Sequence, residues 1–292
     1  MSDVAYTVVK ASAEKSRMLS ERQLIELVSS RDLNELISKL RNIYPELSDI
    51  KPDSKAIEEK LLELFYKKID EFIEIIPSYK ELLELLRQEF EEEKIAETIV
   101  ERYKKGLLDE IIDLNLNEEL KKIIEYEVPG VLISFASKYR ILKLIRSIKK
   151  YGIYKVLKSY ISLKVDEHNI LTIIRGIKNN IRKDILMSLL ILEEGEFNKE
   201  LLLNALKEES IDKILSVLGM SKYIDNQRAI ERDFEKKLIA ILKKMYYKDY
   251  AGLGEIIAYI EMKKNEIRNI MRIAIGIERG IPSNIIIQEF II

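Results

Sequence analysis

Cysteine is absent from this 292-residue chain, tryptophan is absent too, and histidine occurs only once. Without cysteine, the chain forms no disulfide, no cysteine-bound zinc site and no cysteine nucleophile. The single histidine, His168, excludes a metal site built from two histidines of one chain. It also lacks the Glu three residues before it that di-iron helical bundles use. We therefore expect no catalytic residue, no metal and no cofactor.

Glycine and proline are scarce as well, with ten and five residues respectively. So few helix breakers favour long helices over a β fold rich in turns. Hydrophobic residues make up 47% of the chain and charged residues 34%. Such a chain can bury a large core and cover it with ion pairs, and its length suits two or three domains.

Long apolar runs are also missing. The longest uncharged stretches lie near 128–137 and 185–192, whereas a membrane-spanning helix needs about 20 apolar residues. The net charge of −1 provides no general attraction for nucleic acid or for an anionic membrane. We expect no nucleic-acid partner and no direct membrane span, so any attachment to a membrane is through a protein partner.

The chain lacks the Gly-x-x-x-x-Gly-Lys-Ser/Thr loop that binds phosphate groups. The stretch GLGEII at 252–257 begins like a dinucleotide-binding fingerprint, but it lacks the third glycine and a preceding strand pattern. The mixture of Lys and Tyr at 243–250 is found on nucleic-acid surfaces. With a neutral net charge, a patch at the edge of the core or at an interface explains this stretch better.

One segment of the sequence occurs twice. NILTIIRGIKNNI at 169–181 aligns without a gap with NIMRIAIGIERGI at 269–281, at an offset of 100. Their apolar residues recur at helical spacing and predict one buried stripe in each copy, up to Ile181 and Ile281. Gly176 and Gly276 lie inside these helices, where glycine costs about 1 kcal/mol relative to alanine. Its presence in both copies indicates close approach of another helix.

A second pattern also repeats, in the segments 19–44 and 197–223. Each predicts two short helices joined at an acidic break and ending in a tyrosine. Ser20, with Gln23 three residues later, is the expected N-cap of the first pair, and Asn198 is the expected N-cap of the second.

These repeats predict an all-α fold of three similar helical domains, at 1–105, 106–194 and 195–292. The segments 91–107 and 106–124 are the weaker candidates for the last helix of the first domain and the opening helices of the second. Pro129 and Gly130 predict a turn that ends a helix. Three such units form an open solenoid or a closed ring with pseudo-threefold symmetry.

The chain resembles a known family, the C subunits of archaeal and bacterial A/V-type rotary ATPases, which are similar to the d subunit of the vacuolar enzyme. The resemblance rests on 5–20, 31–44, 160–176 and 253–291. Within these, the recurring polar positions are Asp166, Asn169 and Arg175 in the first copy and Lys264, Glu266, Arg268, Asn269 and Arg272 in the second. Residues 106–160 match the family poorly.

The resemblance implies a funnel or socket with pseudo-threefold symmetry and no catalytic activity. Its expected place is the central stalk, between rotor-shaft subunits of the D and F type and the membrane ring of proteolipid subunits. The expected location is the cytoplasmic face of the cell membrane, held there through that ring. Asn169, Arg175, Asn269 and Arg272 are the candidate partner-interface residues, although they can equally brace helix ends within the fold.

Two other hypotheses about the function stay open. A helical-repeat scaffold for protein interactions, without a rotary role, explains the repeats but not the pattern at 253–291. An enzyme with an unrecognised carboxylate site is disfavoured by the lack of cysteine and the single histidine.

Overall fold

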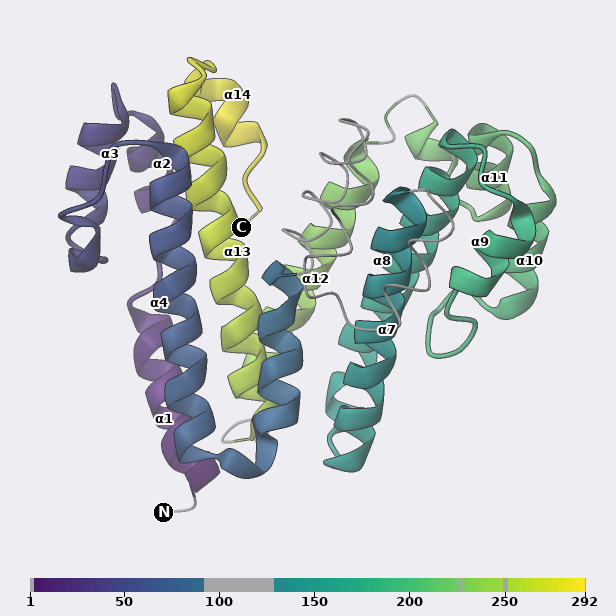
Figure 1. Ribbon diagram of the computed structural model, residues 1–292, viewed down its shortest axis with the longest axis horizontal. Coiled ribbons are helices and arrows are strands. Elements are labelled where there is room, and N and C mark those ends of the chain that lie inside the picture. Colours follow the sequence, from purple (N-terminus) through teal and green to yellow (C-terminus); the bar gives the residue numbers. More distant parts are fainter. Residues whose placement is uncertain (1–2, 92–128, 225, 227, 249–251, 292) are drawn as a thin grey trace, which may run out of the picture. The chain divides into compact units, whose positions relative to one another are not determined.

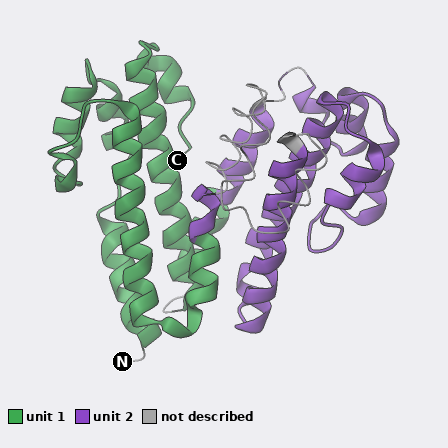
Figure 2. Cartoon of the chain, in the orientation of Figure 1, with its two compact units in different colours: residues 1–86, 239–292 green, residues 87–238 purple. Residues whose placement is uncertain are grey.

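The computed structural model describes residues 3–91, 129–224, 226, 228–248 and 252–291, and every regular element in these ranges is a helix (Figure 1). The predicted all-α class is confirmed. The chain divides into two compact units (Figure 2): unit 1 comprises residues 1–86 and 239–292, and unit 2 comprises residues 87–238. The helix at 80–91 and α12 (Arg228–Lys248) each contribute residues to both units.

Unit 1 is built around α13 (Leu253–Glu278), which packs along α1 (Asp3–Ser16) and α4 (Ser54–Ile75). These three helices run side by side in Figure 1. The shorter helices α2 (Glu21–Val28), α3 (Leu33–Leu40) and α14 (Ser283–Gln288) also pack on α13, and the 3₁₀ turns η1 (Pro45–Leu47) and η2 (Pro77–Tyr79) flank α4. Eighteen of the 26 residues of α13 are buried, so polar side chains on this helix need partners inside the protein.

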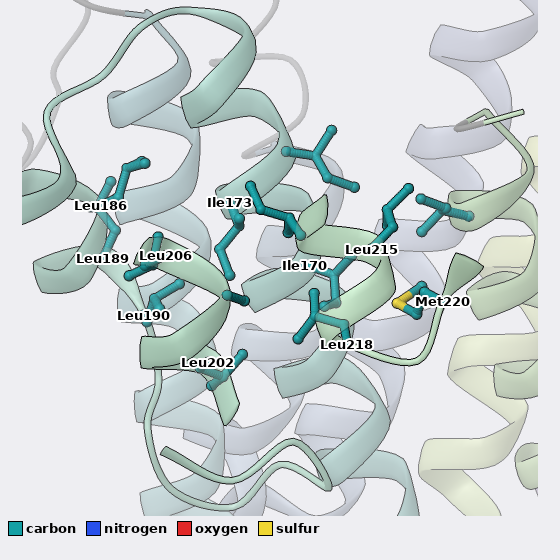
Figure 3. Close-up of a cluster of buried hydrophobic side chains, with 14 of the residues drawn as sticks. Ile170, Ile173, Leu186, Leu189, Leu190, Leu202, Leu206, Leu215, Leu218 and Met220 are labelled. Atoms are coloured by element: carbon teal, nitrogen blue, oxygen red, sulfur yellow. The ribbon is translucent and has the colours of Figure 1, made fainter. Parts of the chain in front are cut away.

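Unit 2 is built around α8 (Tyr154–Lys178), which packs along α7 (Pro129–Lys150) and is followed by α9 (Lys183–Leu189). The next helices are α10 (Lys199–Lys207), α11 (Ile211–Val217) and the 3₁₀ turn η4 (Ser221–Tyr223). Side chains from α8 to α11 form one hydrophobic core (Figure 3), which includes Ile170, Ile173, Leu186, Leu202, Leu206 and Leu215.

The predicted helix pairs are confirmed together with their caps. Ser20 begins α2 with a capping box, in which it accepts from the Gln23 N–H and the Gln23 side chain accepts from the Ser20 N–H. Asn198 caps α10 by accepting from the Leu201 N–H. The second helix of each pair is capped too, by Asp32 in α3 and by Ser210 in α11. All four caps satisfy backbone donors that a helix start leaves unpaired.

Two details of the sequence prediction are wrong. Pro129 and Gly130 lie in α7 and not in a turn, and the residues before them, where a helix was predicted to end, are outside the described ranges. The repeated helices stop before the end of the predicted stripe, because Asn180 and Gly280 adopt positive φ and terminate α8 and α13. Ile181 is still buried in the core, but Ile281 is 37% exposed.

The predicted division into three domains is not settled by these helices. Its first boundary, at 105/106, and the segments 91–107 and 106–124 lie outside the described residues, apart from Glu91 in the helix at 80–91. The second boundary, at 194/195, falls in the loop between α9 and α10, yet both helices pack into the core of Figure 3.

Candidate functional site

Two groups of four helices share three helix–helix contacts: the long helix with the short helix that follows it, that short helix with the first helix of a pair, and the two helices of the pair with each other. The central module consists of α8 to α11, which follow one another along the chain. The C-terminal module consists of α13 and α14 together with α2 and α3, which come from the beginning of the sequence and pack on α13. The residues that hold each module together occupy equivalent positions, and the asparagines and glycines among them belong to the repeated sequence segments.

Asn169 and Asn269 each clamp one peptide group of the segment that follows the short helix. The Asn169 amide donates to the Ile191 carbonyl at 2.8 Å and accepts from the Ile191 N–H at 2.8 Å. The Asn269 amide makes the same pair of bonds to Ile291, at 2.8 and 3.3 Å. Both side chains are buried, so each clamp satisfies a donor and an acceptor that have no access to water. This contact is a structural role within the fold, the alternative to a partner contact that the sequence left for Asn169 and Asn269.

The two glycines mark close approach in both modules, as predicted. A Cβ atom on Gly176 would lie 2.1 Å from Leu186 Cδ2, and one on Gly276 would lie 2.5 Å from Ile286 Cδ1. Leu186 and Ile286 occupy equivalent positions in α9 and α14, at the offset of 100. Equivalent short helices, α9 and α14, therefore pack against the glycine of their long helices, α8 and α13.

A carboxylate on each long helix fixes the start of the helix pair. Asp166 accepts from the backbone N–H groups of Glu196 and Phe197, at 3.0 and 3.2 Å. Glu266, one hundred residues later, accepts from the Leu19 N–H at 2.6 Å. Phe197 and Leu19 are the residues directly before the caps of α10 and α2. Equivalent carboxylates therefore position equivalent helix pairs.

The electrostatic settings of these two carboxylates differ. Burial raises the pKa of Asp166, and its two backbone hydrogen bonds oppose that rise by stabilising the carboxylate. Glu266 also accepts from the Tyr44 hydroxyl at 3.0 Å and pairs with Lys263 at 2.6 Å. Burial and the nearby Glu266 charge raise the pKa of Tyr44, so its hydroxyl stays a donor. Both carboxylates are engaged with the chain itself.

A buried lysine recurs as well. Lys164 pairs with Glu89 at 3.1 Å, and Lys264 pairs with Glu261 at 2.5 Å and donates to the Leu86 carbonyl at 3.4 Å. Glu89 and Leu86 both belong to the helix at 80–91. A charge buried this deeply is tolerated only with such partners. Lys164 therefore joins α8 to the part of the helix at 80–91 that belongs to unit 2, and Lys264 joins α13 to the part that belongs to unit 1.

The candidate arginines do not form an equivalent pair. At the offset of 100, Arg175 corresponds to Ile275 and Arg272 corresponds to Thr172. Arg175 is part of an exposed ion pair with Glu231 at 2.8 Å. Arg272 donates to the Asn269 amide oxygen at 3.1 Å, so it supports the clamp from outside.

His168 is a buried structural residue. Its Nε2 lies 2.9 Å from the Leu189 carbonyl and its Nδ1 lies 3.3 Å from the Ser137 hydroxyl. Nε2 therefore carries the proton and donates, while Nδ1 accepts. Burial lowers the pKa of His168 to about 4, which keeps the ring neutral near pH 7.

Unit 1 contains a pocket of about 230 Å³ beside the clamp and the carboxylate of the C-terminal module. It is lined by Asn265, Glu266, Asn269 and Ile291 of that module, by Met18, Leu19 and Ser20 ahead of α2, and also by Glu21, Leu24, Ile239, Lys243 and Met262. Across the described ranges, no cluster of His, Asp and Glu side chains is arranged to hold a metal ion. No helix among the described residues is long and apolar enough to cross a bilayer.

Sequence reasoning singled out Asp166 and Glu266 as parts of a pattern but gave them no role. The signal was present, because both residues are acidic and stand at the same offset as the two asparagines. Their partners, Phe197 and Leu19, are found only once the helix pairs are placed in space.

Comparisons with known proteins point to one family. The model of a family described as "ATP synthase (C/AC39) subunit" matches residues 136–289, more than half of the chain. The C subunit of the A-type ATP synthase of Methanobrevibacter smithii is 28% identical over 330 aligned residues, covering 96% of this chain and 85% of that relative. The matched range of the family model contains both clamp asparagines, Asn169 and Asn269.

Proposed function

Because the chain belongs to the C/AC39 subunit family of ATP synthases, we propose that it is the non-catalytic central-stalk subunit of an A/V-type rotary ATPase. In this role it is a socket that couples the soluble rotor shaft to the membrane proteolipid ring and transmits torque between them. The observation that carries the proposal is the family match, which spans the two repeated helix segments 169–181 and 269–281.

The construction of the modules suits a part that carries torque. Moving one elementary charge across 100 mV yields about 2.3 kcal/mol, and several such steps accumulate in the rotor for each ATP. A coupling element that deforms under this load loses energy. The asparagine clamps, the buried Lys164–Glu89 ion pair and the glycine contacts hold α8 and α13 to neighbouring segments through several independent contacts, which favours a stiff module.

We place the protein at the cytoplasmic face of the cell membrane, held through the proteolipid ring. The proposed architecture is the pseudo-threefold funnel, of which the two modules represent repeated walls. Shaft subunits of the D and F type are the proposed partners on the soluble side. Contacts that include exposed charge pairs weaken when salt shortens the Debye length to about 3 Å at 1 M, so high salt should help to release the protein without detergent.

Reconstitution tests this proposal directly. The purified chain should bind shaft subunits from the same source, and it should join membranes only where the proteolipid ring is present. Protein-free anionic vesicles are the matched control, and flotation with them should leave the chain in the soluble fraction. Strong binding to these vesicles, or failure to bind the shaft, would refute the rotary role.

Arg175 remains the candidate for a contact with a partner. Its pair with Glu231 is exposed and contributes at most about 1 kcal/mol to stability, so Arg175→Ala should leave the melting temperature nearly unchanged. If Arg175 contacts a partner, the variant uncouples ATP hydrolysis from ion pumping in the assembled enzyme. Arg272→Ala should instead lower the melting temperature, because Arg272 braces Asn269.

The second candidate function, a helical scaffold without a rotary role, is favoured only by the repeated helix pairs. A scaffold of this kind should bind partners other than the rotor shaft. Selective binding of the shaft therefore separates the two functions.

A further inference from the structure

The pocket of the C-terminal module corresponds to the place that a loop occupies in the central module. In the central module, the chain leaves the Asn169 clamp at Ile191 and reaches the cap of α10 through residues 192–197. In the C-terminal module, no loop of this kind precedes α2, because α2 follows α1 in the chain. The equivalent space is bounded by the pocket residues Ile291 and Leu19.

The floor of the pocket matches the residues that the loop covers. The loop crosses α8 at Val165 and Asp166, and Gly195 approaches so closely that a Cβ there would lie 2.5 Å from Asp166 Oδ1 and 3.1 Å from Val165 Cγ1. The residues at the offset of 100 are Asn265 and Glu266, and both line the pocket. Val165 is fully buried, whereas Asn265 is only half-buried and lines the pocket, so this part of the helix surface is covered by a peptide in one module and accessible in the other. Asp166 and Glu266 are both buried.

The pocket offers groups that suit a peptide. Asn265 stands where the central module has Val165, and its amide donates to the Ile291 carbonyl at 2.8 Å. Lys243 is exposed at the pocket, and no acidic side chain within the described ranges pairs with it. The loop of the central module, LEEGEF at 192–197, is acidic and carries its glycine at the point of closest approach. Glu21 also lines the pocket, and its negative charge counteracts the attraction of Lys243 for an acidic peptide.

We propose that this pocket binds a short, extended, acidic peptide segment with a glycine, supplied by another polypeptide of the assembly, in the place that residues 192–195 occupy in the central module. Met18 and Leu19 already fill the place of Glu196 and Phe197. The source of the peptide rests on the proposed function, whereas the peptide-binding property rests on the equivalence of the two modules. The pocket volume of about 230 Å³ admits a few residues rather than a folded domain.

A peptide with the sequence of residues 192–195, LEEG with blocked ends, probes the binding property in the isolated full chain. Among the methionines, Met18 and Met262 line the pocket, whereas Met187 and Met220 belong to the central module. Methyl NMR should show peptide-dependent shifts for the first two and none for the last two. The expected Kd is on the order of 1 mM, because a short flexible peptide loses entropy on binding.

Charge and shape variants sharpen this test. Lys243→Glu should weaken binding about tenfold and Glu21→Lys should strengthen it, while Lys244→Glu, on a neighbouring exposed residue outside the pocket, should leave it unchanged. A peptide with valine in place of its glycine should not bind. Equal binding of both peptides, shifts spread over all methionines, or equal effects of the two lysine variants would overturn the proposal.

The absence of cysteine allows a second measurement in the assembled enzyme. A single cysteine introduced by Lys243→Cys should react with maleimide at least tenfold more slowly in the assembly than in the isolated chain. Lys244→Cys should react at similar rates in both. Unchanged labelling at position 243, in an enzyme that assembles and with peptide binding intact, would overturn the proposed partner but not the rotary role. Failure to assemble would count against the rotary role alone.

Discussion

Asn169 and Asn269 each make two hydrogen bonds to equivalent peptide groups, but the second peptide group has a further side-chain partner. Asn169 alone satisfies both polar groups of Ile191, whereas the Ile291 carbonyl also accepts from Asn265 at 2.8 Å. The longer bond, from the Ile291 N–H to Asn269, is 3.3 Å. The same residue type therefore contributes unequally to stability at the two positions.

Replacing each asparagine by alanine tests this difference. Asn169→Ala should cost about 2–4 kcal/mol, because it leaves a buried donor and a buried acceptor unpaired. Asn269→Ala should cost less, since Asn265 retains one of the two bonds. Thermal unfolding measures both, at about 2–4 °C for each kcal/mol, and the exposed Asn179→Ala is the control. Equal losses for the two buried sites would contradict this account.

His168 makes stability depend on pH. Its pKa is about 4 in the folded protein and about 6.5 in an unfolded chain, so the unfolded state binds the proton first as pH falls. Stability should therefore be intact above pH 6.5 and decline by about 3 kcal/mol between pH 6.5 and 4. His168→Gln keeps a donor near the Leu189 carbonyl and should remove this part of the decline. An unchanged pH profile in that variant would assign the decline to other groups.

At the scale of elements, the packing of α9 on α8 depends on the missing side chain at Gly176. Gly176→Ala places a methyl group against Leu186, and overpacking of this kind costs about 1–3 kcal/mol. Leu186→Ala alone should also destabilise, by leaving a cavity. The double variant should lose less than the sum of the two, because each change relieves the other. Strict additivity in urea unfolding would show that α9 does not fill this gap.

Many of the helices and their caps could be predicted from the sequence. Periodicity identified the repeated helices, and the residue types Ser20 and Asn198 identified two helix starts, because caps and stripes are local patterns. The predicted stripes extended too far, since termination depends on the φ angles of Asn180 and Gly280. Glycine at 280 is a common terminator, but asparagine at 180 is less specific.

At the scale of the whole molecule, the modules of the structure group the helices differently from the repeats of the sequence. Sequence comparison places each helix pair at the start of a domain, at 19–44 and at 197–223. In space, the pair at 197–223 is bound to the preceding long helix α8 through Asp166, and the pair at 19–44 is bound to α13, which is distant in the sequence, through Glu266. Sequence periodicity carries no information on which helix a pair packs against, so this part could not be predicted.

Hydrogen exchange on the full chain tests this pairing of segments. Glu266→Ala should increase amide exchange in residues 19–44 and leave residues 197–223 unchanged, because Glu266 bonds to Leu19 and Tyr44. Asp166→Ala is the matched variant and should do the reverse, through Glu196 and Phe197. If either substitution loosens both helix pairs to the same degree, the modules are not the cooperative units described above.

The composition of the C-terminal module also sets the order of events during synthesis. The central module can fold once α11 has left the ribosome, since its helices are consecutive. The helices α2 and α3 are made first, but their partners α13 and α14 are made last. At about 5–20 residues per second, their apolar faces wait roughly 10–50 s for those partners. During translation the nascent chain therefore depends on chaperones, or on transient contacts of its own, to protect the oldest part of the protein.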